Sequence, residues 1–370
     1  MDFLNKLNGL LNILIKYKGT DLHIKSNSPA RLRVQNEVMM LNDDILDSQT
    51  IEALADHFIV SEERGNITLK ETIYSKKEID SIYILNKKHH FRVNIYTHYY
   101  GIALDFKFIK QEIKTIEDLK LPNSLHKISK LKEGLVLLSG ANQSGKSSLL
   151  ASFVEEINKL AHKHIITIEE PIEYLFKDKG CIIEQREIGR DTCSYKEAIY
   201  SAMRADPDII VVGEIKDKET AEAILHAVST GHLVFSTLHA TNVVDTIEKL
   251  FSYFTLEDKN CVRFTLAHSL EAVITQRLIE GISCEIVPAI EILCKSPTIE
   301  KLIYNNRDDK ILETMKKESE FGSITFEQSL YTLTLNKEIS EAVAYNYASS
   351  PAELKLMFSK NEYIIKQDVL

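Results

Sequence analysis

The stretch Gly140-Ala-Asn-Gln-Ser-Gly-Lys-Ser147 decides how this chain folds. It matches the phosphate-binding loop pattern G-x-x-x-x-G-K-[ST] at each fixed position. The apolar residues 135–138 before it read as a buried strand, and residues 148–154 after it read as a helix. A strand, a glycine-containing loop and a helix in this order distinguish the motif from a chance glycine turn. The stretch predicts an α/β core with a nucleoside triphosphate site at the end of a strand.

Each residue type in this loop suits a phosphate ligand. Gly140 and Gly145 let the backbone curl so that successive N–H groups point at one anion, and the following helix adds the positive end of its dipole. Lys146 can reach the β- and γ-phosphates, and the hydroxyl of Ser147 is the expected Mg²⁺ ligand. The predicted binding set for ATP and Mg²⁺ in the loop is Gly140, Ser144, Gly145, Lys146, Ser147 and Ser148.

The composition is that of an ordinary soluble protein with room for two domains. Of the 370 residues, 44% are hydrophobic and 27% are charged. The net charge of −9 argues against a general polyanion binder and leaves room for a local basic patch, and we expect no direct nucleic-acid partner. The five cysteines are dispersed with no C-x-x-C pair, so we expect reduced thiols and no zinc site. No segment approaches the roughly 18 apolar residues of a membrane span, and the first residues do not resemble an export signal. We therefore expect a cytoplasmic protein.

The chain has two parts that differ in the order of their predicted strands and helices. In residues 1–119, short strand-like segments and helices lack βαβ order, which predicts a small α+β domain. Its predicted strands are residues 21–25, 30–34, 81–85, 90–96 and 102–109, and its predicted helices are residues 2–17 and 48–60. A charged stretch interrupted by Leu-Pro-Asn predicts a linker at residues 120–133.

The part at residues 134–370 alternates strands with helices and then becomes mostly helical after residue 293. Its predicted strands are residues 135–138, 165–168, 209–212, 233–238 and 289–293, and its predicted helices include residues 146–160, 195–204 and 219–230. This order is typical of a doubly wound α/β sheet, in which ligands bind at the carboxyl ends of the strands.

Polar residues follow the predicted core strands at the edge where the phosphate loop lies. Glu173 follows the second strand, Glu214 follows the third, and the fourth runs from His232 to His239. An ATP hydrolase needs a carboxylate for hydrated Mg²⁺, another to orient or deprotonate water, and a donor that senses the γ-phosphate. We assign these roles to Glu214, Glu173 and His239, so that Ser147 and Glu214 are the predicted metal ligands. His232 completes the predicted catalytic set, although it can equally cap a strand or pack in the core.

Four further segments resemble the motifs of one ATPase family. They are Ile-Thr-Ile-Glu-Glu-Pro-Ile-Glu-Tyr at 166–174, Gln-Arg-Glu-Ile-Gly-Arg-Asp at 185–191, Arg-Ala-Asp-Pro-Asp-Ile-Ile-Val-Val-Gly-Glu at 204–214 and Thr-Gly-His-Leu-Val-Phe-Ser-Thr-Leu-His at 230–239. They look like the acidic box, arginine-bearing segment, Walker B motif and histidine box of the type II/IV secretion ATPases. Segments 19–23, 91–94 and 322–328 are also similar. The resemblance implies a RecA-like P-loop NTPase core preceded by a small α+β, PAS-like domain.

Within this family the chain most resembles the pilus-retraction branch, the PilT and PilU group of twitching motility. Members for pilus assembly and type II secretion usually carry a longer N-terminal region and a four-cysteine zinc insert, which this sequence does not show. Thr-Ile-Glu-Lys-Leu-Ile at 298–303 departs from the retraction signature. Segments 164–168, 179–183 and 313–322 look more like the accessory, PilU-like motor.

Three single residues also depart from the family pattern. Gln143 stands in place of a glycine, Glu170 in place of an aspartate, and Lys216 in place of an arginine. Lys cannot form the planar bidentate fork of Arg, and Glu has a longer reach than Asp. Each departure leaves an evident catalytic group in place, so we expect slower turnover rather than a dead ATPase.

The resemblance implies a homo-hexameric ring that hydrolyses ATP to power pilus retraction. Its implied partners are an inner-membrane pilus platform protein, at which the cytoplasmic ring is peripheral, and a paralogous motor ATPase. Arg92, Arg190 and Arg204 are candidate γ-phosphate or interface arginines, with surface ion pairs as the alternative. Other functions stay open at this point: a nucleotide-binding scaffold subunit that co-assembles with another pilus motor, a pilus assembly or type II secretion ATPase, and a RecA-type nucleic-acid translocase.

Overall fold

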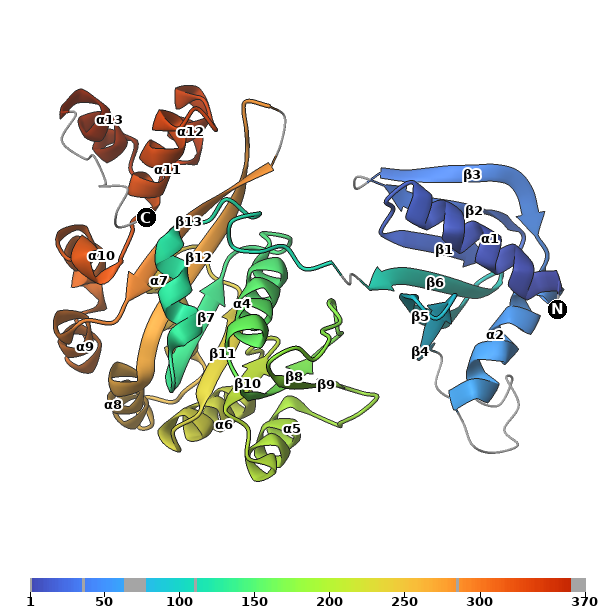
Figure 1. Cartoon of the computed structure of the whole chain (residues 1–370), viewed down its shortest axis with the longest axis horizontal. Coiled ribbons are helices and arrows are strands. Elements are labelled where there is room, and N and C mark those ends of the chain that lie inside the picture. The colour runs from blue at the N-terminus through green and yellow to red at the C-terminus, as the bar shows by residue number, and fades with distance from the viewer. Residues whose placement is uncertain (1, 35–36, 63–77, 110–111, 284–285, 361–370) are drawn as a thin grey trace. The chain divides into compact units, whose positions relative to one another are not determined.

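The computed structural model describes residues 2–34, 37–62, 78–109, 112–283 and 286–360. The chain forms two compact units, an N-terminal unit of residues 1–111 and a C-terminal unit of residues 112–370 (Figure 1). Each unit has its own β-sheet and its own buried core.

The N-terminal unit is an antiparallel sheet with two helices packed on it. The strand order is β3-β2-β1-β6-β5-β4, and neighbouring strands pair antiparallel. Along β5 the buried residues Phe91, Val93 and Ile95 alternate with more exposed ones, as expected of a sheet with one covered face. Leu11 and Phe58, one from each helix, join the same core, which confirms the predicted α+β class. The bounds are α1 (Asp2–Lys16), β1 (Asp21–Lys25), β2 (Ser28–Val34), β3 (Glu37–Leu46), α2 (Ser48–Glu62), β4 (Glu78–Leu85), β5 (His89–His98) and β6 (Gly101–Ile109).

Strand β3 is absent from the predicted strands. It lies at the edge of the sheet and pairs with β2. Its residues Val38, Met39 and Met40 are exposed at consecutive positions, so no alternation of buried and exposed residues marks the strand in the sequence.

The C-terminal unit is built on a seven-stranded sheet in the order β13-β12-β7-β11-β10-β8-β9. Neighbouring strands are parallel except β13, which runs antiparallel to β12. The carboxyl ends of the parallel strands therefore meet at one edge, where ligands bind in such sheets. This arrangement confirms the predicted doubly wound core. The bounds are β7 (Gly134–Ser139), β8 (His164–Glu169), β9 (Ile182–Glu187), β10 (Ile209–Val212), β11 (Leu233–Leu238), β12 (Leu270–Glu280) and β13 (Ile286–Cys294).

Two of these strands, β9 and β12, are absent from the predicted set. Strand β9 is an edge strand that ends in the polar residues Glu-Gln-Arg-Glu, so it lacks the apolar run of its neighbours. Strand β12 begins at Leu270 directly after helix α8 ends at Ser269, with no turn residue between the two elements. The sequence therefore contains no Gly, Pro or other turn signal that marks the start of this strand.

Helices cover both faces of this sheet. Leu135 and Leu137 of β7 face one core, whereas Val136 and Leu138 face the other. The second core includes α4 (Lys146–Leu160) and a 3₁₀ helix, η1 (Asn123–Lys130). The first core lies under α5 (Tyr195–Ala202), α6 (Lys218–Ser229), α7 (Val243–Ser252), α8 (Lys259–Ser269), α9 (Pro297–Tyr304) and α10 (Ile311–Lys317).

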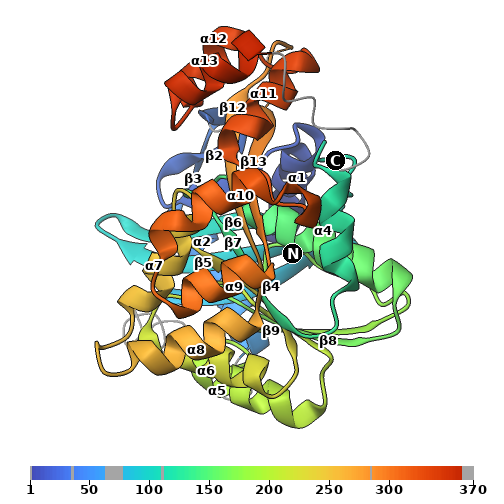
Figure 2. The same ribbon diagram turned by 90° about the vertical axis from the view of Figure 1, so that its left-hand side faces the viewer.

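The last helices of the described chain form a separate layer beside the end of the sheet. They are α11 (Phe326–Leu335), α12 (Glu341–Tyr347) and α13 (Pro351–Lys360), and Figure 2 shows them together above α9 and α10. Leu330, Ala344 and Leu354 of these helices pack with Ile279 and Ala289 of β12 and β13. The predicted helical end of the chain is confirmed over the described residues.

The predicted linker at residues 120–133 lies inside the C-terminal unit. Leu121, Leu125 and Ile128 are buried and share a core with Phe153 of α4. The two units divide between Gln111 and Glu112, ahead of the predicted boundary. The reason is that η1 buries an apolar face against α4 instead of forming a solvated joint.

Candidate active site

The phosphate loop connects the carboxyl end of β7 to the first turn of α4. Gly140 and Gly145 have φ angles of 149° and 90°, in the region that favours glycine. A Cβ atom on Gly140 would lie 2.4 Å from Ser144 Oγ and 2.5 Å from the carbonyl oxygen of Gln276. A Cβ atom on Gly145 would lie 2.5 Å from Gln276 Nε2. Both positions therefore require glycine for conformation and for space.

Lys146 is buried and folds its side chain back over the loop. Its Nζ donates hydrogen bonds to the carbonyl oxygens of Gly140 and Ala141, at 2.8 Å each, and lies 3.4 Å from His239 Nδ1. Burial lowers the pKa of the Lys146 ammonium, and the charges of Glu214 and Glu173 oppose this shift. A buried cation bonded to neutral carbonyls is well placed to bind a phosphate anion.

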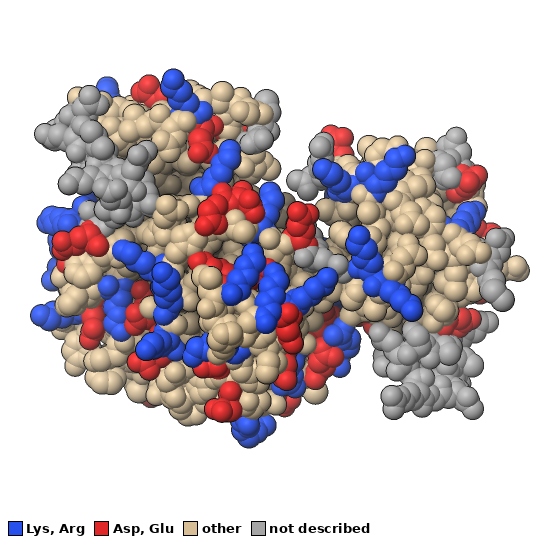
Figure 3. All heavy atoms as spheres, viewed as in Figure 1, with Lys and Arg blue, Asp and Glu red and all other residues tan. Residues whose placement is uncertain are grey.

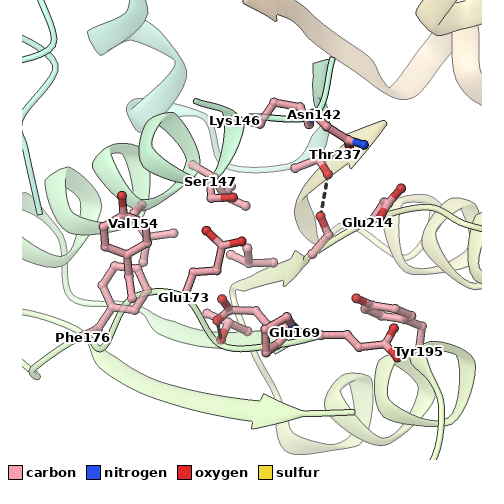
Figure 4. A pocket seen from close by; sticks show the side chains of 18 of the residues that line it. Asn142, Lys146, Ser147, Val154, Glu169, Glu173, Phe176, Tyr195, Glu214 and Thr237 are labelled. Atoms are coloured by element: carbon pink, nitrogen blue, oxygen red, sulfur yellow. Dashed lines mark hydrogen bonds between the residues drawn. The ribbon is translucent and has the colours of Figure 1, made fainter. Parts of the chain in front are cut away.

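A pocket beside the loop gathers polar side chains from the carboxyl ends of several strands (Figure 4). Figure 4 shows the carboxylate of Glu173 turned toward Ser147. His239 Nε2 lies 2.9 Å from Glu214 Oε1, which links the residue after β11 to the loop after β10. The polar lining includes Asn142, Gln143, Lys146, Ser147, Thr167, Glu169, Glu170, Glu173, Glu214, Thr237 and His239. The structure thus brings together three of the predicted catalytic residues with Lys146 and Ser147.

Glu169 is a pocket residue that the predicted site set does not contain. It is the last residue of β8, and its Oε1 accepts hydrogen bonds from Thr167 Oγ1 at 2.6 Å and Gln185 Nε2 at 3.2 Å. Burial raises the pKa of the Glu169 carboxyl to about 6, although these two donors lower it. The sequence signal was its place between an apolar strand and Glu173.

The donor set suits a Mg²⁺ ion that arrives together with a nucleotide. Among the residues that the structure describes, no group of three or more His, Cys, Asp or Glu side chains is arranged to hold a metal by itself. Mg²⁺ in nucleotide sites is usually held by one or two protein ligands, the phosphates and water. The hydroxyl of Ser147 and the carboxylate of Glu214, both in the pocket, fit that requirement.

Of the three residues that depart from the family pattern, Gln143 and Glu170 line this pocket and Lys216 contacts Glu170. Gln143 has a φ angle of 62°, which glycine adopts without strain, so the backbone keeps the conformation that the family glycine favours. Lys216 Nζ donates a hydrogen bond of 2.7 Å to Glu170 Oε2 and lies 5.9 Å from the centre of the Tyr195 ring. Burial raises the pKa of the Tyr195 hydroxyl, so this side chain is neutral in the site.

The predicted residues His232 and Ser148 are not among those that line the pocket. His232 precedes β11 at the amino end of the strand, the opposite edge from the phosphate loop. Its Nδ1 lies 3.0 Å from Thr230 Oγ1 and 3.0 Å from the carbonyl oxygen of Ala227, so it caps the end of α6 and is no part of the pocket that this chain forms. Ser148 lies in the first turn of α4, and its Oγ is 2.6 Å from the hydroxyl of Tyr174, which itself lines the pocket.

The three predicted arginines also lie outside the pocket lining. Arg92 belongs to the N-terminal unit, where its Nη2 lies 3.0 Å from Asp80 Oδ2. Arg190 forms a two-pronged pair with the neighbouring Asp191. Arg204 donates to the carbonyl oxygen of Tyr200 and lines a separate open hollow on the C-terminal unit. Local partners of this kind are those of the surface ion-pair alternative.

The described helices include none that is both long enough and apolar enough to cross a membrane. On the face of the C-terminal unit seen in Figure 3, the Lys and Arg side chains are interspersed with Asp and Glu. This mixed surface differs from the single-sign patch that marks many nucleic-acid-binding proteins.

Comparison with known proteins agrees with these features over most of the chain. Residues 7–339 match the family described as type II/IV secretion system protein. The chain is 34% identical over 342 residues to the type IV pilus retraction ATPase PilT of Pseudomonas aeruginosa, covering 92% of this chain and 98% of that one. It is 32% identical over 352 residues to the type IV pilus ATPase PilU of the same organism, covering 94% and 90%.

Solved structures give the same result. The crystal structure of the pilus retraction motor PilT with bound ADP superposes with a TM-score of 0.85 at 32% identity, covering 95% of this chain and 99% of that one. This likeness confirms the predicted N-terminal domain and RecA-like core. The chain belongs to the type II/IV secretion system protein family.

Proposed function

We propose that this chain is an ATP-hydrolysing motor of type IV pilus retraction. The observation that carries the proposal is the pocket in which Lys146, Glu214 and His239 converge beside the phosphate loop. The likeness to PilT and PilU over more than nine tenths of the chain supports the motor assignment.

The residues of the pocket divide the work of hydrolysis. Lys146 binds the β- and γ-phosphates, because its ammonium already lies over the loop. Ser147 and Glu214 hold Mg²⁺, which when bound neutralises the charge that develops on the phosphates. His239 contacts the γ-phosphate from the side of Lys146 and Glu214. The γ-phosphate thereby gains a contact that ADP cannot make.

Two carboxylates beside the loop act on the attacking water. Glu173 orients the water, since its carboxylate is turned toward Ser147. Glu169 takes the proton, because burial raises its pKa to about 6 and a general base works best with a pKa near the operating pH. Thr167 and Gln185 fix the Glu169 carboxylate by hydrogen bonds, so it needs no rearrangement to act.

The proposed assembly is a homo-hexamer on the cytoplasmic side of the inner membrane. In a ring, Arg92, Arg190 and Arg204 exchange their local partners for the nucleotide or for a neighbouring subunit. Closure of the two units on ATP and their release after hydrolysis then deliver force to the pilus platform protein. Segments that resemble the accessory motor favour a role beside a paralogous motor.

Two measurements test this function. Purified protein hydrolyses ATP, and Glu214→Gln lowers the turnover at least about 100-fold. Equal turnover in the two proteins identifies a nucleotide-binding scaffold instead. In cells, deletion of the gene leaves excess surface pili if the chain is the main motor, and weakens retraction only under load if it is the accessory one. Unchanged pilus number and retraction in both conditions contradict the motor assignment.

A further inference from the structure

Residues 322–328, which resemble a segment of the family, lie beside β12 and β13. Ile324 pairs with Ile292 of β13, and Thr325 forms a capping box with Gln328 at the start of α11. The ring of Phe326 then lies 4.0 Å from the guanidinium carbon of Arg277 on β12. The segment therefore supports one arginine at the carboxyl end of a core strand.

Arg277 joins two distant parts of the C-terminal unit. Its Nη2 donates a hydrogen bond of 2.9 Å to the carbonyl oxygen of Thr241, two residues beyond His239. Its Nη1 donates to the carbonyl oxygen of Tyr347 at 3.3 Å, and both nitrogens lie 3.5 Å from Ser349 Oγ. One planar guanidinium thus bridges the loop that carries His239 and the connection between α12 and α13. Stacking on Phe326 fixes the plane of this group.

The first turn of α7, which follows the loop that carries His239, is held by polar contacts to two strands. The backbone N–H of Val243 donates to Glu291 Oε2 of β13 at 2.8 Å. Thr246 Oγ1 contacts both the carbonyl oxygen of Asn242 and Ser139 Oγ, at 2.7 Å each. Ser139 is the last residue of β7, directly before the phosphate loop. The loop therefore leads into a helix that is fixed to the strands, and Arg277 links the loop to the helical layer.

We propose that Arg277 is a positioning residue that couples the nucleotide state at His239 to helices α12 and α13. The inference rests on the proposed role of His239 as the residue that senses the γ-phosphate. A ligand shifts a conformational equilibrium only through contacts that differ between the states, and the His239 contact exists with ATP and is absent with ADP. Thermodynamic linkage makes this coupling reciprocal. The factor by which ATP instead of ADP shifts the equilibrium of α12 and α13 is also the factor by which a change in these helices shifts the preference for ATP over ADP.

Enzyme kinetics test the positioning role. Arg277→Ala lowers kcat about tenfold, because a small displacement of a catalytic group is costly, and leaves the affinity for ADP unchanged. Arg277→Lys keeps the charge but loses the bidentate geometry, so it restores turnover only in part. Arg307→Ala, which removes an exposed arginine paired with Asp309, is the matched control and leaves kcat unchanged.

A double-mutant cycle tests whether Arg277 acts through His239. If it does, Arg277→Ala in a His239→Ala background lowers kcat by less than about twofold, since the group that it positions is already gone. A further tenfold loss in that background shows that the two residues act independently and overturns the proposal. The affinities of ADP and the non-hydrolysable analogue AMPPNP, measured by titration, give a second reading. Arg277→Ala weakens AMPPNP binding while ADP binding is retained.

Hydrogen exchange at α12 and α13 tests the coupling separately from hydrolysis. In the full-length protein, exchange in these helices differs at least about twofold between AMPPNP and ADP, and Arg277→Ala removes the difference. Equal exchange with both nucleotides in the unmodified protein contradicts the coupling even if ATP is hydrolysed. Failure of the unmodified protein to hydrolyse ATP contradicts the proposed function instead. Should Arg277→Ala melt early, Ser349→Ala removes the contact to Ser349 and keeps the one to the Tyr347 carbonyl, so it reduces the difference in exchange, and an unchanged difference contradicts the coupling.

Discussion

Lys216 Nζ lies 2.7 Å from Glu170 Oε2, so two of the three residues that depart from the family pattern form an ion pair with each other. A longer acid meets a shorter base where the family usually has Asp and Arg. The pair lies at the edge of the pocket that Glu170 lines. We therefore expect the two departures to compensate one another and their effects on turnover to be coupled.

Shortening the acid alone breaks this pair. Glu170→Asp lowers ATP turnover about threefold, because the carboxylate no longer reaches the ammonium, while Glu170→Asp with Lys216→Arg restores the contact through a longer, forked base. Steady-state turnover of the two single variants and the double variant measures the coupling. If the fold-loss of turnover in the double variant equals the product of the losses in the two single variants, the residues do not compensate one another. Glu313→Asp, which shortens the acid of an exposed pair with Lys317, serves as the control.

Replacing His239 separates chemistry from nucleotide binding. His239→Ala lowers kcat about 100-fold, because the γ-phosphate loses a donor that matters mainly in the transition state. The affinity for ADP stays within about twofold, since ADP lacks that phosphate. Turnover together with titration of ADP checks both parts. His162→Ala, at an exposed histidine that contacts the carbonyl of Gly180, is the control. A parallel loss of ADP affinity would place His239 in general nucleotide binding.

The proposed base gives hydrolysis a defined dependence on pH. Glu169 accepts a proton only when ionised, and burial holds its pKa at about 6, so kcat rises as the pH increases through about 6. Glu169→Gln lowers kcat at least about 100-fold and removes this acid limb. Glu173→Gln lowers kcat but leaves the limb in place. A pH profile of the three proteins distinguishes the two carboxylates, and an acid limb that persists in Glu169→Gln assigns the base elsewhere.

Glu291 makes the stability of the fold fall with rising pH. Burial raises its folded pKa to about 7, above the 4.5 of the unfolded chain, so between these values the folded protein binds more protons. Its contribution is fully present below the unfolded pKa and is lost as the pH rises through about 7, by on the order of 3 kcal/mol. Glu291→Gln still accepts the hydrogen bond from Val243 and removes this slope. Urea unfolding from pH 5 to pH 8 checks it, and an unchanged slope in the variant contradicts the assignment.

The sequence predicts most of the core sheet and much of the pocket, for a physical reason. Buried parallel strands such as β7 and β10 are short apolar runs, and the phosphate loop fixes which of their ends carries the site. Glu173, Glu214 and His239 follow such runs and are therefore found. His232 comes before β11 in the sequence. It therefore lies at the amino end of that strand, at the edge of the sheet opposite the phosphate loop.

The features that the sequence does not reveal depend on tertiary contacts. Edge strands such as β3 lack a buried face, and β12 is a strand because β7 and β13 flank it. Glu169 becomes distinctive only through its burial and its two donors. Nothing in the local sequence distinguishes Arg277 from other arginines. Its role depends on contacts with Thr241 and Tyr347, which are far from it in the sequence.

The central claim is that this chain hydrolyses ATP at the phosphate loop, and Lys146→Ala tests it most directly. Turnover of the purified protein is compared with that of the variant, with melting temperature and circular dichroism as controls for folding. We expect the variant to fold normally while its turnover falls at least about 100-fold, because no other cation among the described residues contacts Gly140 and Ala141 of the loop. Undiminished hydrolysis in folded Lys146→Ala protein would contradict it.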